Sequence, residues 1–399
     1  MKTYSQSLEQ LAATGHLRRL PEIVHQGRHI VSEGRAMVNL SSNDYLGLAA
    51  RMDLRNQFLE ELKQTDLPLS SSSSRLLTGN YASYTELEQL MADRFGREAV
   101  LLFNSGYHAN TGILPALADK QTLILADRLV HASIIDGILL SGASFNRYKH
   151  ADYEHLERLL ASSASRYEQV IIVTESIFSM DGDIADLQRL AALKRTYPNV
   201  LLYVDEAHAI GVRGENGLGL AEEQNCIREI DLLVGTFGKA LASMGAYVVC
   251  EKVIRDYLVN TMRPLIFSTA LPPAQIAWTR FLFERLPDWT AERRQLAVAS
   301  RLARACLQGK GGEISNSHIV PYLLGTNEAC IQKAEELQRE GFYCLPVRPP
   351  TVPKGTSRIR FSLTADVTAG EIGRLAGLIE EGKSENRAKA FPNKNKDEL

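Results

Sequence analysis

Paired cysteines and long apolar runs are both missing from this sequence of 399 residues. The five cysteines are odd in number and form no Cys-x-x-Cys pair. They are Cys226, Cys250, Cys306, Cys330 and Cys344. This usage favours a reduced cytoplasm over a disulfide scaffold. No run has the length of a membrane span, and residues 1–7 contain no apolar signal core. We therefore expect neither membrane insertion nor export.

An excess of one charge is missing too. The chain has 45 basic and 47 acidic residues, a net charge of −2, and no basic stripe that could follow a phosphate backbone. Residues 205–208 spell Asp-Glu-Ala-His, as in helicase ATPases, but Lys239 and Lys310 are not followed by the Ser or Thr of a P-loop. A nucleic-acid motor is therefore excluded, and we expect no nucleic-acid partner.

The last residues, 384–399, form a polar tail that we expect to be disordered. They end in Lys-Asp-Glu-Leu, which is an endoplasmic-reticulum retrieval address. Because no entry signal precedes it, we interpret this ending as a coincidence.

Short apolar runs alternate with amphipathic segments, a pattern that predicts an α/β protein with a mostly parallel sheet covered by helices. Strands are expected at residues 170–173, 201–204 and 246–250, and a helix at 85–95, opened by the capping box Ser83-x-x-Glu86. Hydrophobic residues make up 45% of the chain, enough for substantial cores. No internal repeat is present.

The order of these elements predicts an N-terminal arm at residues 1–45, a large α/β domain at 46–285 and a smaller α+β domain at 286–383. In the smaller domain we expect a helix at 329–340 ended by Gly341, a strand at 358–363, and a helix opened by Thr368-x-x-Glu371.

Lys239 lies among small and apolar neighbours, shortly after the apolar run 231–234. Desolvation lowers the pKa of a lysine toward the range in which its neutral amine attacks a carbonyl. Schiff-base formation with an aldehyde cofactor would use such an amine. Taken alone, the pattern fits a surface lysine after a strand equally well.

Asp205 ends a run, 201–205, that predicts a buried parallel strand, and His208 follows three residues later. In parallel sheets ligands bind beyond the carboxyl ends of the strands, where Asp205 would lie. An aspartate that faces a pyridine nitrogen keeps it protonated, and a protonated ring makes pyridoxal phosphate an electron sink.

A phosphate site is predicted where the apolar run 100–103 is followed by a tight glycine turn and a helix start. The amides of Gly106 and Tyr107 would lie in the first helical turn, where free N–H groups and the helix dipole bind phosphate. An ordinary strand-to-helix connection has the same pattern, so this site depends on Lys239 and Asp205.

From about residue 18 to residue 368, the chain resembles the α-oxoamine synthases, which are fold-type-I enzymes dependent on pyridoxal phosphate. The matching blocks follow the order of the family and are residues 41–48, 178–183, 205–211 and the lysine signature 236–242. The resemblance implies that fold, with a large PLP-binding domain and a smaller C-terminal domain.

The resemblance also implies roles at matching positions. Lys239 would form the Schiff base, Asp205 would pair with the pyridine nitrogen, and His208 would contact the phenolic oxygen of the ring. Further implied contacts are Gly106, Tyr107 and Thr236 around the phosphate, Ser179 near the ring, and His131 stacked on the ring beside the substrate. On its spacing alone, His131 would be read as an ordinary loop histidine.

For the substrates, Arg360 matches the family arginine that binds the amino-acid carboxylate, a task that suits a guanidinium. Arg358 shares its strand face, so the sequence does not decide which of the two enters the site. Arg18 and Thr351 resemble positions that face the acyl substrate. The resemblance further implies a homodimer, in which Ser268 and Thr269 reach the phosphate of the neighbour.

Segments 267–275 and 349–353 favour the family reaction that condenses L-alanine with pimeloyl-CoA, or a pimeloyl carrier protein, to 8-amino-7-oxononanoate, CoA and CO2 in biotin biosynthesis. No metal is required. The serine run 70–74 replaces a glycine-containing stretch of many relatives, which leaves the acyl-chain preference open. Alternatives are a glycine- or serine-using member of the family, such as 2-amino-3-ketobutyrate ligase, an aminotransferase, and a non-catalytic binding protein.

Overall fold

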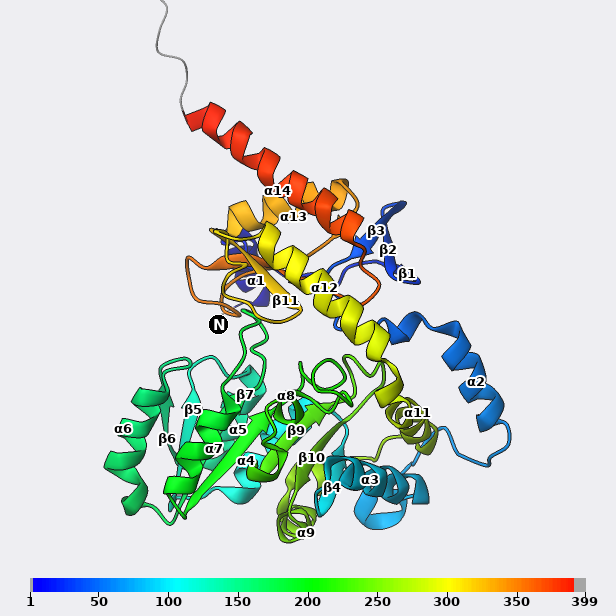
Figure 1. Cartoon of the computed structure of the whole chain (residues 1–399), viewed down its shortest axis with the longest axis vertical. Coiled ribbons are helices and arrows are strands. Elements are labelled where there is room, and N and C mark those ends of the chain that lie inside the picture. Colours follow the sequence, from blue (N-terminus) through cyan, green and yellow to red (C-terminus); the bar gives the residue numbers. More distant parts are fainter. Residues whose placement is uncertain (1–2, 391–399) are drawn as a thin grey trace, which may run out of the picture. The chain divides into compact units, whose positions relative to one another are not determined.

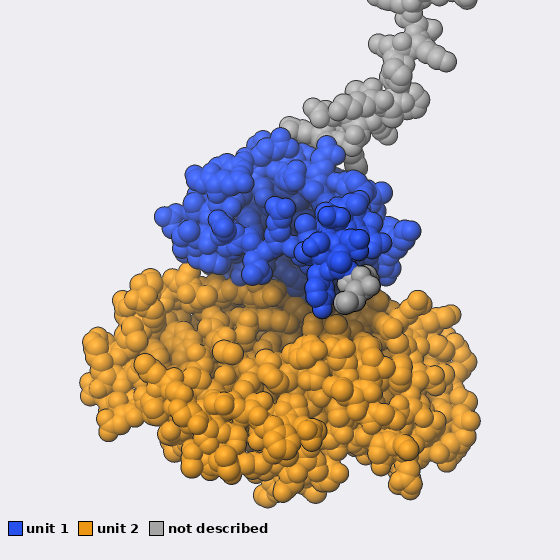
Figure 2. All heavy atoms as spheres, turned by 180° about the vertical axis from the view of Figure 1, so that it is seen from behind, with its two compact units in different colours: residues 1–42, 180–182, 295–399 blue, residues 43–179, 183–294 orange. Residues whose placement is uncertain are grey.

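The computed structural model describes residues 3–390 of the chain, with side chains as far as residue 380. It divides into two compact units (Figures 1 and 2). Unit 1 comprises Met1–Ser42, Met180–Gly182 and Gln295–Leu399, and unit 2 comprises Asn43–Ser179 and Asp183–Arg294. The segment predicted as a separate N-terminal arm thus groups with the C-terminal part of the chain. The later border falls inside helix α12 (Thr290–Cys306), whereas the sequence placed a border at 285/286.

Unit 2 is built around a seven-stranded sheet of order β4-β10-β9-β8-β7-β5-β6. All its strands run parallel except β10, which is antiparallel to both of its neighbours. The carboxyl ends of the parallel strands therefore meet at one edge. The strands are β4 (Ala99–Phe103), β5 (Thr122–Asp127), β6 (Ser144–Tyr148), β7 (Gln169–Glu175), β8 (Val200–Asp205), β9 (Leu232–Thr236) and β10 (Ala246–Cys250).

Helices cover both faces of this sheet, which explains why its strands read as continuous apolar runs. Side chains of α4, α5 and α9 form one core with alternate strand residues such as Ile171, Tyr203 and Val234. The helices of unit 2 are α2 (Met52–Leu62), α3 (Ala82–Phe95), α4 (Gly106–Leu117), α5 (Ala132–Ser141), α6 (Tyr153–Ser163), α7 (Leu187–Thr196), α8 (Leu220–Glu223), α9 (Lys252–Thr261), α10 (Arg263–Ile266) and α11 (Pro273–Glu284). Short turns of helix are η1 (Leu48–Ala50), η2 (Arg75–Gly79), η3 (Ala164–Arg166), η4 (Ile227–Glu229) and η5 (Leu286–Asp288).

Unit 1 contains two small sheets, of order β1-β2-β3-β12 and β11-β14-β13. In the first, the parallel pairing of β12 with β3 joins the N-terminal strands to the C-terminal part of the chain. The strands are β1 (Val24–Gln26), β2 (His29–Ser32), β3 (Arg35–Asn39), β11 (Ile319–Gly325), β12 (Phe342–Tyr343), β13 (Pro346–Val347) and β14 (Ser357–Ser362). The helices that lie wholly in this unit are α1 (Tyr4–Ala13), α13 (Asn327–Arg339) and α14 (Ala369–Ala390).

The two predicted capping boxes behave differently. At α14, the Thr368 hydroxyl accepts the Glu371 N–H at 3.2 Å, and the Glu371 carboxylate accepts the Thr368 N–H at 2.9 Å. At α3, the predicted box is wrong: the N-cap is Tyr81, and Ser83 lies inside the helix. The buried Ser83 hydroxyl has no hydrogen-bond partner among the described residues.

The final helix extends beyond its predicted end. Helix α14 continues through residues 384–390, which the sequence assigned to the disordered tail. Residues 391–399, including the terminal Lys-Asp-Glu-Leu, lie outside the described residues. Within residues 3–390, no helix combines the length and the apolarity that a membrane crossing needs.

The contrast between the two boxes leads to a matched prediction for stability. Thr368→Ala removes a hydroxyl that caps a helix and should cost about 1 kcal/mol of the free energy of unfolding. Ser83→Ala removes a hydroxyl that makes no such bond, so its cost should be close to zero. Urea unfolding of both variants measures the difference, and an equal loss in both would contradict the assignment of the caps.

Candidate active site

Three neighbouring strands of the large sheet end in an acidic or polar residue at the carboxyl-end edge. Glu175 ends β7, Asp205 ends β8 and Thr236 ends β9. Glu175 and Asp205 are direct neighbours in the pairing of their strands. Because these strands are parallel and adjacent, residues far apart in the chain meet here.

Lys239 and His208, which the resemblance assigns to the same cofactor, are in direct contact. Lys239 Nζ lies 2.9 Å from His208 Nε2, and His208 Nδ1 lies 2.7 Å from the hydroxyl of Tyr45. The Tyr45 hydroxyl donates its proton to Asn43 at 2.9 Å, so it accepts from Nδ1–H of His208. Nε2 is then the acceptor that faces Lys239.

The loop that carries Lys239 is fixed by Thr236. The Thr236 hydroxyl donates to the Gly245 carbonyl at 2.9 Å and accepts the Gly238 N–H at 3.2 Å. Within the same turn, Ala242 has a positive φ of 43°. These bonds hold the half-buried Lys239 just beyond the end of β9.

Asp205 is buried, with 7% exposure, and both of its carboxylate oxygens accept hydrogen bonds. Oδ1 accepts the Ala207 N–H at 2.9 Å, and Oδ2 accepts from the amide of Asn110 at 2.9 Å. The Asn110 amide also donates to Ser133 at 2.9 Å, and its carbonyl oxygen accepts from Tyr203. These partners fix the orientation of the amide that supports the carboxylate.

His131 caps the start of α5 and is exposed on one side. Its Nδ1 lies 2.7 Å from the Ser133 hydroxyl and accepts the Ser133 N–H at 3.2 Å. Partial burial lowers the pKa of His131, the Asp205 carboxylate opposes this shift, and Lys239 adds to it. The ring is therefore neutral at pH 7.

Glu175 has only 3% exposure, and its Oε1 has no hydrogen-bond partner among the described residues. Burial raises its pKa well above the ordinary value, and the Asp205 carboxylate raises it further. Burial and the neighbouring carboxylate therefore both favour the neutral form of Glu175.

The start of α4 forms a cradle beside these residues. Ser105 caps the helix by accepting the His108 N–H at 3.2 Å, and Gly106 and Tyr107 follow in the first turn. Their N–H groups have no acceptor within the helix and can bind an anion. A Cβ added at Gly106 would lie 3.9 Å from the Cβ of Thr236, so the predicted phosphate residues are close together.

Ser268 and Thr269 lie beside the same helix start. Asn104 donates to the Thr269 carbonyl at 2.8 Å. Ser268 lines a small cavity of about 10 Å³ together with Asn104 and His108. Tyr107 was predicted to provide its backbone amide to the phosphate. Its side-chain hydroxyl donates a hydrogen bond to the Asp136 carboxylate at 2.6 Å.

The predicted substrate residues belong to unit 1. Arg18 donates to the Thr351 hydroxyl at 3.0 Å, so these two positions meet. Arg358 is buried in an ion pair with Asp181, whereas the half-buried Arg360 donates to the Ser362 hydroxyl at 2.5 Å. Because a carboxylate of the chain already binds Arg358, Arg358 is the weaker candidate for a substrate carboxylate.

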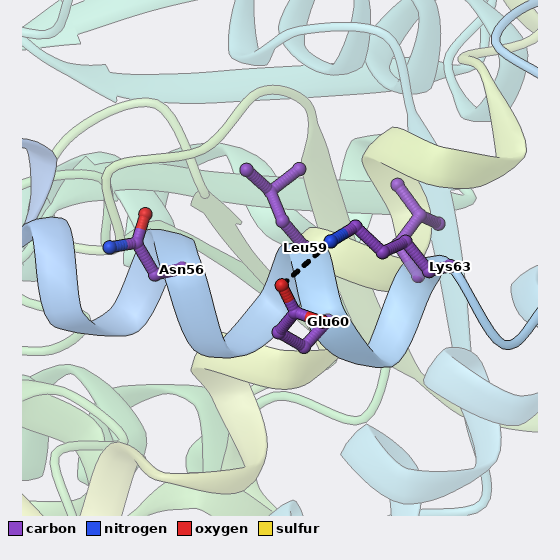
Figure 3. Close-up of a pocket in the computed structure, with 5 residues that line it drawn as sticks. Asn56, Leu59, Glu60 and Lys63 are labelled. Carbon is purple, nitrogen blue, oxygen red and sulfur yellow. Dashed lines mark hydrogen bonds and ion pairs between the residues drawn. The ribbon is translucent and has the colours of Figure 1, made fainter.

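A surface hollow of about 300 Å³ along α2 is lined by Asn56, Leu59, Glu60, Leu62 and Lys63 (Figure 3). Its lining comes from a single helix and includes an ion pair between Glu60 and Lys63 at 2.7 Å. The hollow contains none of the predicted residues, and we assign it no role.

Sequence reasoning missed Tyr45, Asn110, Ser133 and Glu175 as parts of the site. A signal existed for two of them. Asn110 lies one helical turn after Gly106 and so shares its face, and Tyr45 lies in a block that resembles the family. Glu175 carried none, because its neighbour Asp205 is distant in the sequence, and Ser133 was not singled out although it lies two residues after His131.

Known proteins resemble the chain over almost its whole length. The family model described as aminotransferase class I and II matches residues 35–379. A putative 8-amino-7-oxononanoate synthase of Glaesserella parasuis is 62% identical over 95% of this chain and 100% of its own length. One of Pasteurella multocida is 59% identical over 96% of this chain and 99% of its own.

Solved structures show the same fold. A serine palmitoyltransferase from S. paucimobilis with bound PLP has a TM-score of 0.87 and 28% identity, and the match covers 96% of each chain. An 8-amino-7-oxononanoate synthase from Francisella tularensis has a TM-score of 0.75 and 27% identity, and the match covers 88% of this chain and 99% of that one.

The residues at the sheet edge fit pyridoxal phosphate. Lys239 offers an amine for its aldehyde, Asp205 offers a buried carboxylate for its pyridine nitrogen, and the start of α4 offers amides for its phosphate. The chain therefore belongs to the aminotransferase class I and II family and is a pyridoxal-phosphate-dependent acyltransferase of the α-oxoamine synthase type, with the fold-type-I α/β architecture.

Proposed function

We propose that this enzyme condenses L-alanine with a pimeloyl thioester, either pimeloyl-CoA or a pimeloyl carrier protein, to 8-amino-7-oxononanoate, with release of the thiol and CO2. Relatives with 59–62% identity over at least 94% of the chain, all named putative 8-amino-7-oxononanoate synthase, support this choice of substrates. The single observation that carries the chemistry is the contact of Lys239 with His208 beside the buried, hydrogen-bonded Asp205. The product belongs to biotin biosynthesis.

Pyridoxal phosphate, when bound, supplies an aldehyde for the amino group and a ring that accepts the electron pair of Cα. In our proposal, Asp205 holds the proton on the pyridine nitrogen, and Asn110 keeps the Asp205 carboxylate in place. His208 contacts the phenolic oxygen, Ser179 lies near the ring, and the neutral ring of His131 stacks on it beside the substrate.

The first turn of α4 would hold the cofactor phosphate through the amides of Gly106 and Tyr107, and Thr236 lies beside this turn. Within their own chain, Ser268 and Thr269 lie beside the start of α4. We propose a homodimer in which these two residues serve the phosphate of the neighbour, and a cytoplasmic location, which suits the five free cysteines.

Lys239 is the proposed base. With L-alanine bound, the Lys239 amine would remove the Cα proton, and His208 Nε2 would accept a hydrogen bond from the resulting ammonium. The Cα carbon would form a bond to the thioester carbonyl carbon, and the C–S bond would break with departure of a thiolate, which takes a proton from water. After CO2 is lost, Lys239 returns a proton to Cα. Arg360 binds the carboxylate of alanine, and Arg18 and Thr351 face the acyl chain.

A second candidate is the condensation of serine with palmitoyl-CoA. It is favoured by the structural match, since the TM-score of 0.87 with serine palmitoyltransferase exceeds the 0.75 with 8-amino-7-oxononanoate synthase. The much higher identity of the curated relatives favours alanine and the pimeloyl thioester.

Product analysis separates these reactions. With L-alanine and pimeloyl-CoA, we expect one free thiol per 8-amino-7-oxononanoate, identified by mass spectrometry, and a kcat/KM well above that with serine and palmitoyl-CoA or with glycine and acetyl-CoA. A higher kcat/KM with another combination of amino acid and acyl-CoA would show that this combination is the substrate pair. Transfer of the amino group to an oxo acid without thiol release would indicate an aminotransferase instead.

Replacement of the proposed base tests the chemistry. Lys239→Ala should lower kcat by about 10²–10⁴-fold, the usual contribution of a general base, and should abolish the absorbance of the lysine–cofactor imine. The control is Lys120→Ala, at an exposed lysine, which should keep the wild-type kcat and the wild-type absorbance. An unchanged absorbance spectrum in Lys239→Ala would show that another residue binds the cofactor.

The two arginines of β14 give a further prediction. Arg360→Ala should raise KM for L-alanine about 10- to 100-fold, because it removes about 1.5–3 kcal/mol of charged hydrogen bonding, and should leave KM for the acyl donor unchanged. Arg358→Ala breaks the ion pair with Asp181, so it should instead lower the unfolding temperature. Steady-state kinetics and thermal unfolding distinguish the two roles, and a reversed pattern would contradict our assignment.

A further inference from the structure

A charged cluster lies at the same sheet edge, apart from the residues assigned so far. His150, in the loop between β6 and α6, places Nδ1 2.9 Å from Asp127 Oδ1 and Nε2 2.8 Å from Asp183 Oδ2. The Asp127 side chain has 2% exposure, that of Asp183 18%, and that of His150 26%. The cluster is thus mostly removed from water.

This geometry identifies the protonation state of His150. A carboxylate oxygen only accepts hydrogen bonds, and a neutral imidazole carries one N–H. Two hydrogen bonds to two carboxylates therefore require the doubly protonated ring. Burial alone lowers the pKa of His150, but the hydrogen bonds to Asp127 and Asp183 outweigh it and raise the pKa to about 10.

Each partner of His150 belongs to a loop that carries a residue of the proposed site. Asp127 ends β5 and starts the loop to His131; its Oδ1 also accepts the Leu129 N–H at 2.8 Å. Its Oδ2 accepts the Ala151 N–H at 3.0 Å, which joins the loop of His150 to that of His131.

Asp183 continues the segment that contains Ser179. The Phe178 N–H donates to the Asp183 carbonyl at 3.1 Å, so the two ends of this segment are held together. The Phe178 ring meets the His150 ring edge-on, with 4.5 Å between centroids. His150 thus contacts both ends of the segment.

Two other roles do not fit the cluster. Within the described part of the chain, no group of three or more histidine, cysteine or acidic side chains could hold a metal ion. A general base that activates a nucleophile needs a free ring nitrogen, and carboxylates occupy both nitrogens of His150.

We propose that the His150 imidazolium is a positioning residue, which ties the loop of His131 to the loop of Ser179 and so fixes both against the cofactor. This inference rests on the proposed function for its kinetic consequence. Without the positive charge, two buried carboxylates would face each other across the loops, and their repulsion would move His131 and Ser179 away from the ring.

The effect of pH follows from the groups around His150. Besides Asp127 and Asp183, the titratable groups nearby are Tyr148 and Tyr153, whose pKa values burial raises, and Glu175, which senses Asp127. Because the folded pKa of His150 exceeds its unfolded value near 6.5, its contribution to stability is complete below pH 6.5 and is lost as pH rises through about 10.

His150→Gln removes the charge but keeps an amide that can form hydrogen bonds. We expect it to weaken the affinity of the apoenzyme for pyridoxal phosphate about 10- to 100-fold and to lower kcat by up to about 100-fold, since displacements near 1 Å have effects of this size. The double variant H150Q/D183N also removes the carboxylate that His150→Gln leaves without a cation. It should therefore restore part of the affinity for pyridoxal phosphate. The control is His155→Gln, whose ring accepts the Lys149 N–H and lies outside the cluster; it should match the wild type.

Histidine NMR of the wild-type holoenzyme tests the charge directly and does not depend on how any variant folds. We expect the His150 ring to stay doubly protonated from pH 6 to pH 9. Titration near 6.5, or wild-type cofactor affinity and kcat in His150→Gln, would overturn the proposal. Neither the NMR nor the cofactor affinity depends on the acyl donor, so a wrong substrate assignment would leave both results valid.

Discussion

A buried carboxylate at the end of a central strand is the constraint on which the rest of unit 2 depends. An ionised group removed from water is costly unless hydrogen bonds and a cation compensate for it. Asp205 receives N–H groups from Ala207 and Asn110, and Asn110 is itself held by Tyr203 and Ser133. Burial raises the pKa of Glu175 beside it, which favours the form without a second negative charge. The carboxylate is therefore prepared for a cationic partner such as a protonated pyridine.

Parallel strand order supplies the other parts of the site. Because six of the seven strands point the same way, their loops emerge at one edge and bring Lys239, His208 and His131 into one electrostatic environment. Antiparallel β10 allows β4, and with it the start of α4, to lie near the end of β9. The His150 cluster belongs to the same edge, where it joins neighbouring loops through charge rather than through regular pairing.

Local patterns predicted much of the fold. The strand expected at 246–250 is β10, and those at 170–173 and 201–204 are the centres of β7 and β8, since continuous apolar runs need cover on both faces. The capping-box pattern predicted the start of α14 at Thr368 correctly and the start of α3 at Ser83 wrongly. Helix α3 begins at Ala82, so Ser83 is a buried residue inside the helix. The helical pattern of α14 likewise continues past the predicted start of the polar tail.

The sequence by itself determined the type of chemistry through its resemblance to the α-oxoamine synthases, because the lysine signature 236–242 and the other matching blocks follow the order of that family. Only the tertiary structure decided which groups support them. Tyr45 fixes the tautomer of His208, burial beside Asp205 raises the pKa of Glu175, and Asp181 forms an ion pair with Arg358. Each of these effects joins residues that are distant in the chain, and hydrogen bonds and charges act across space rather than along the sequence.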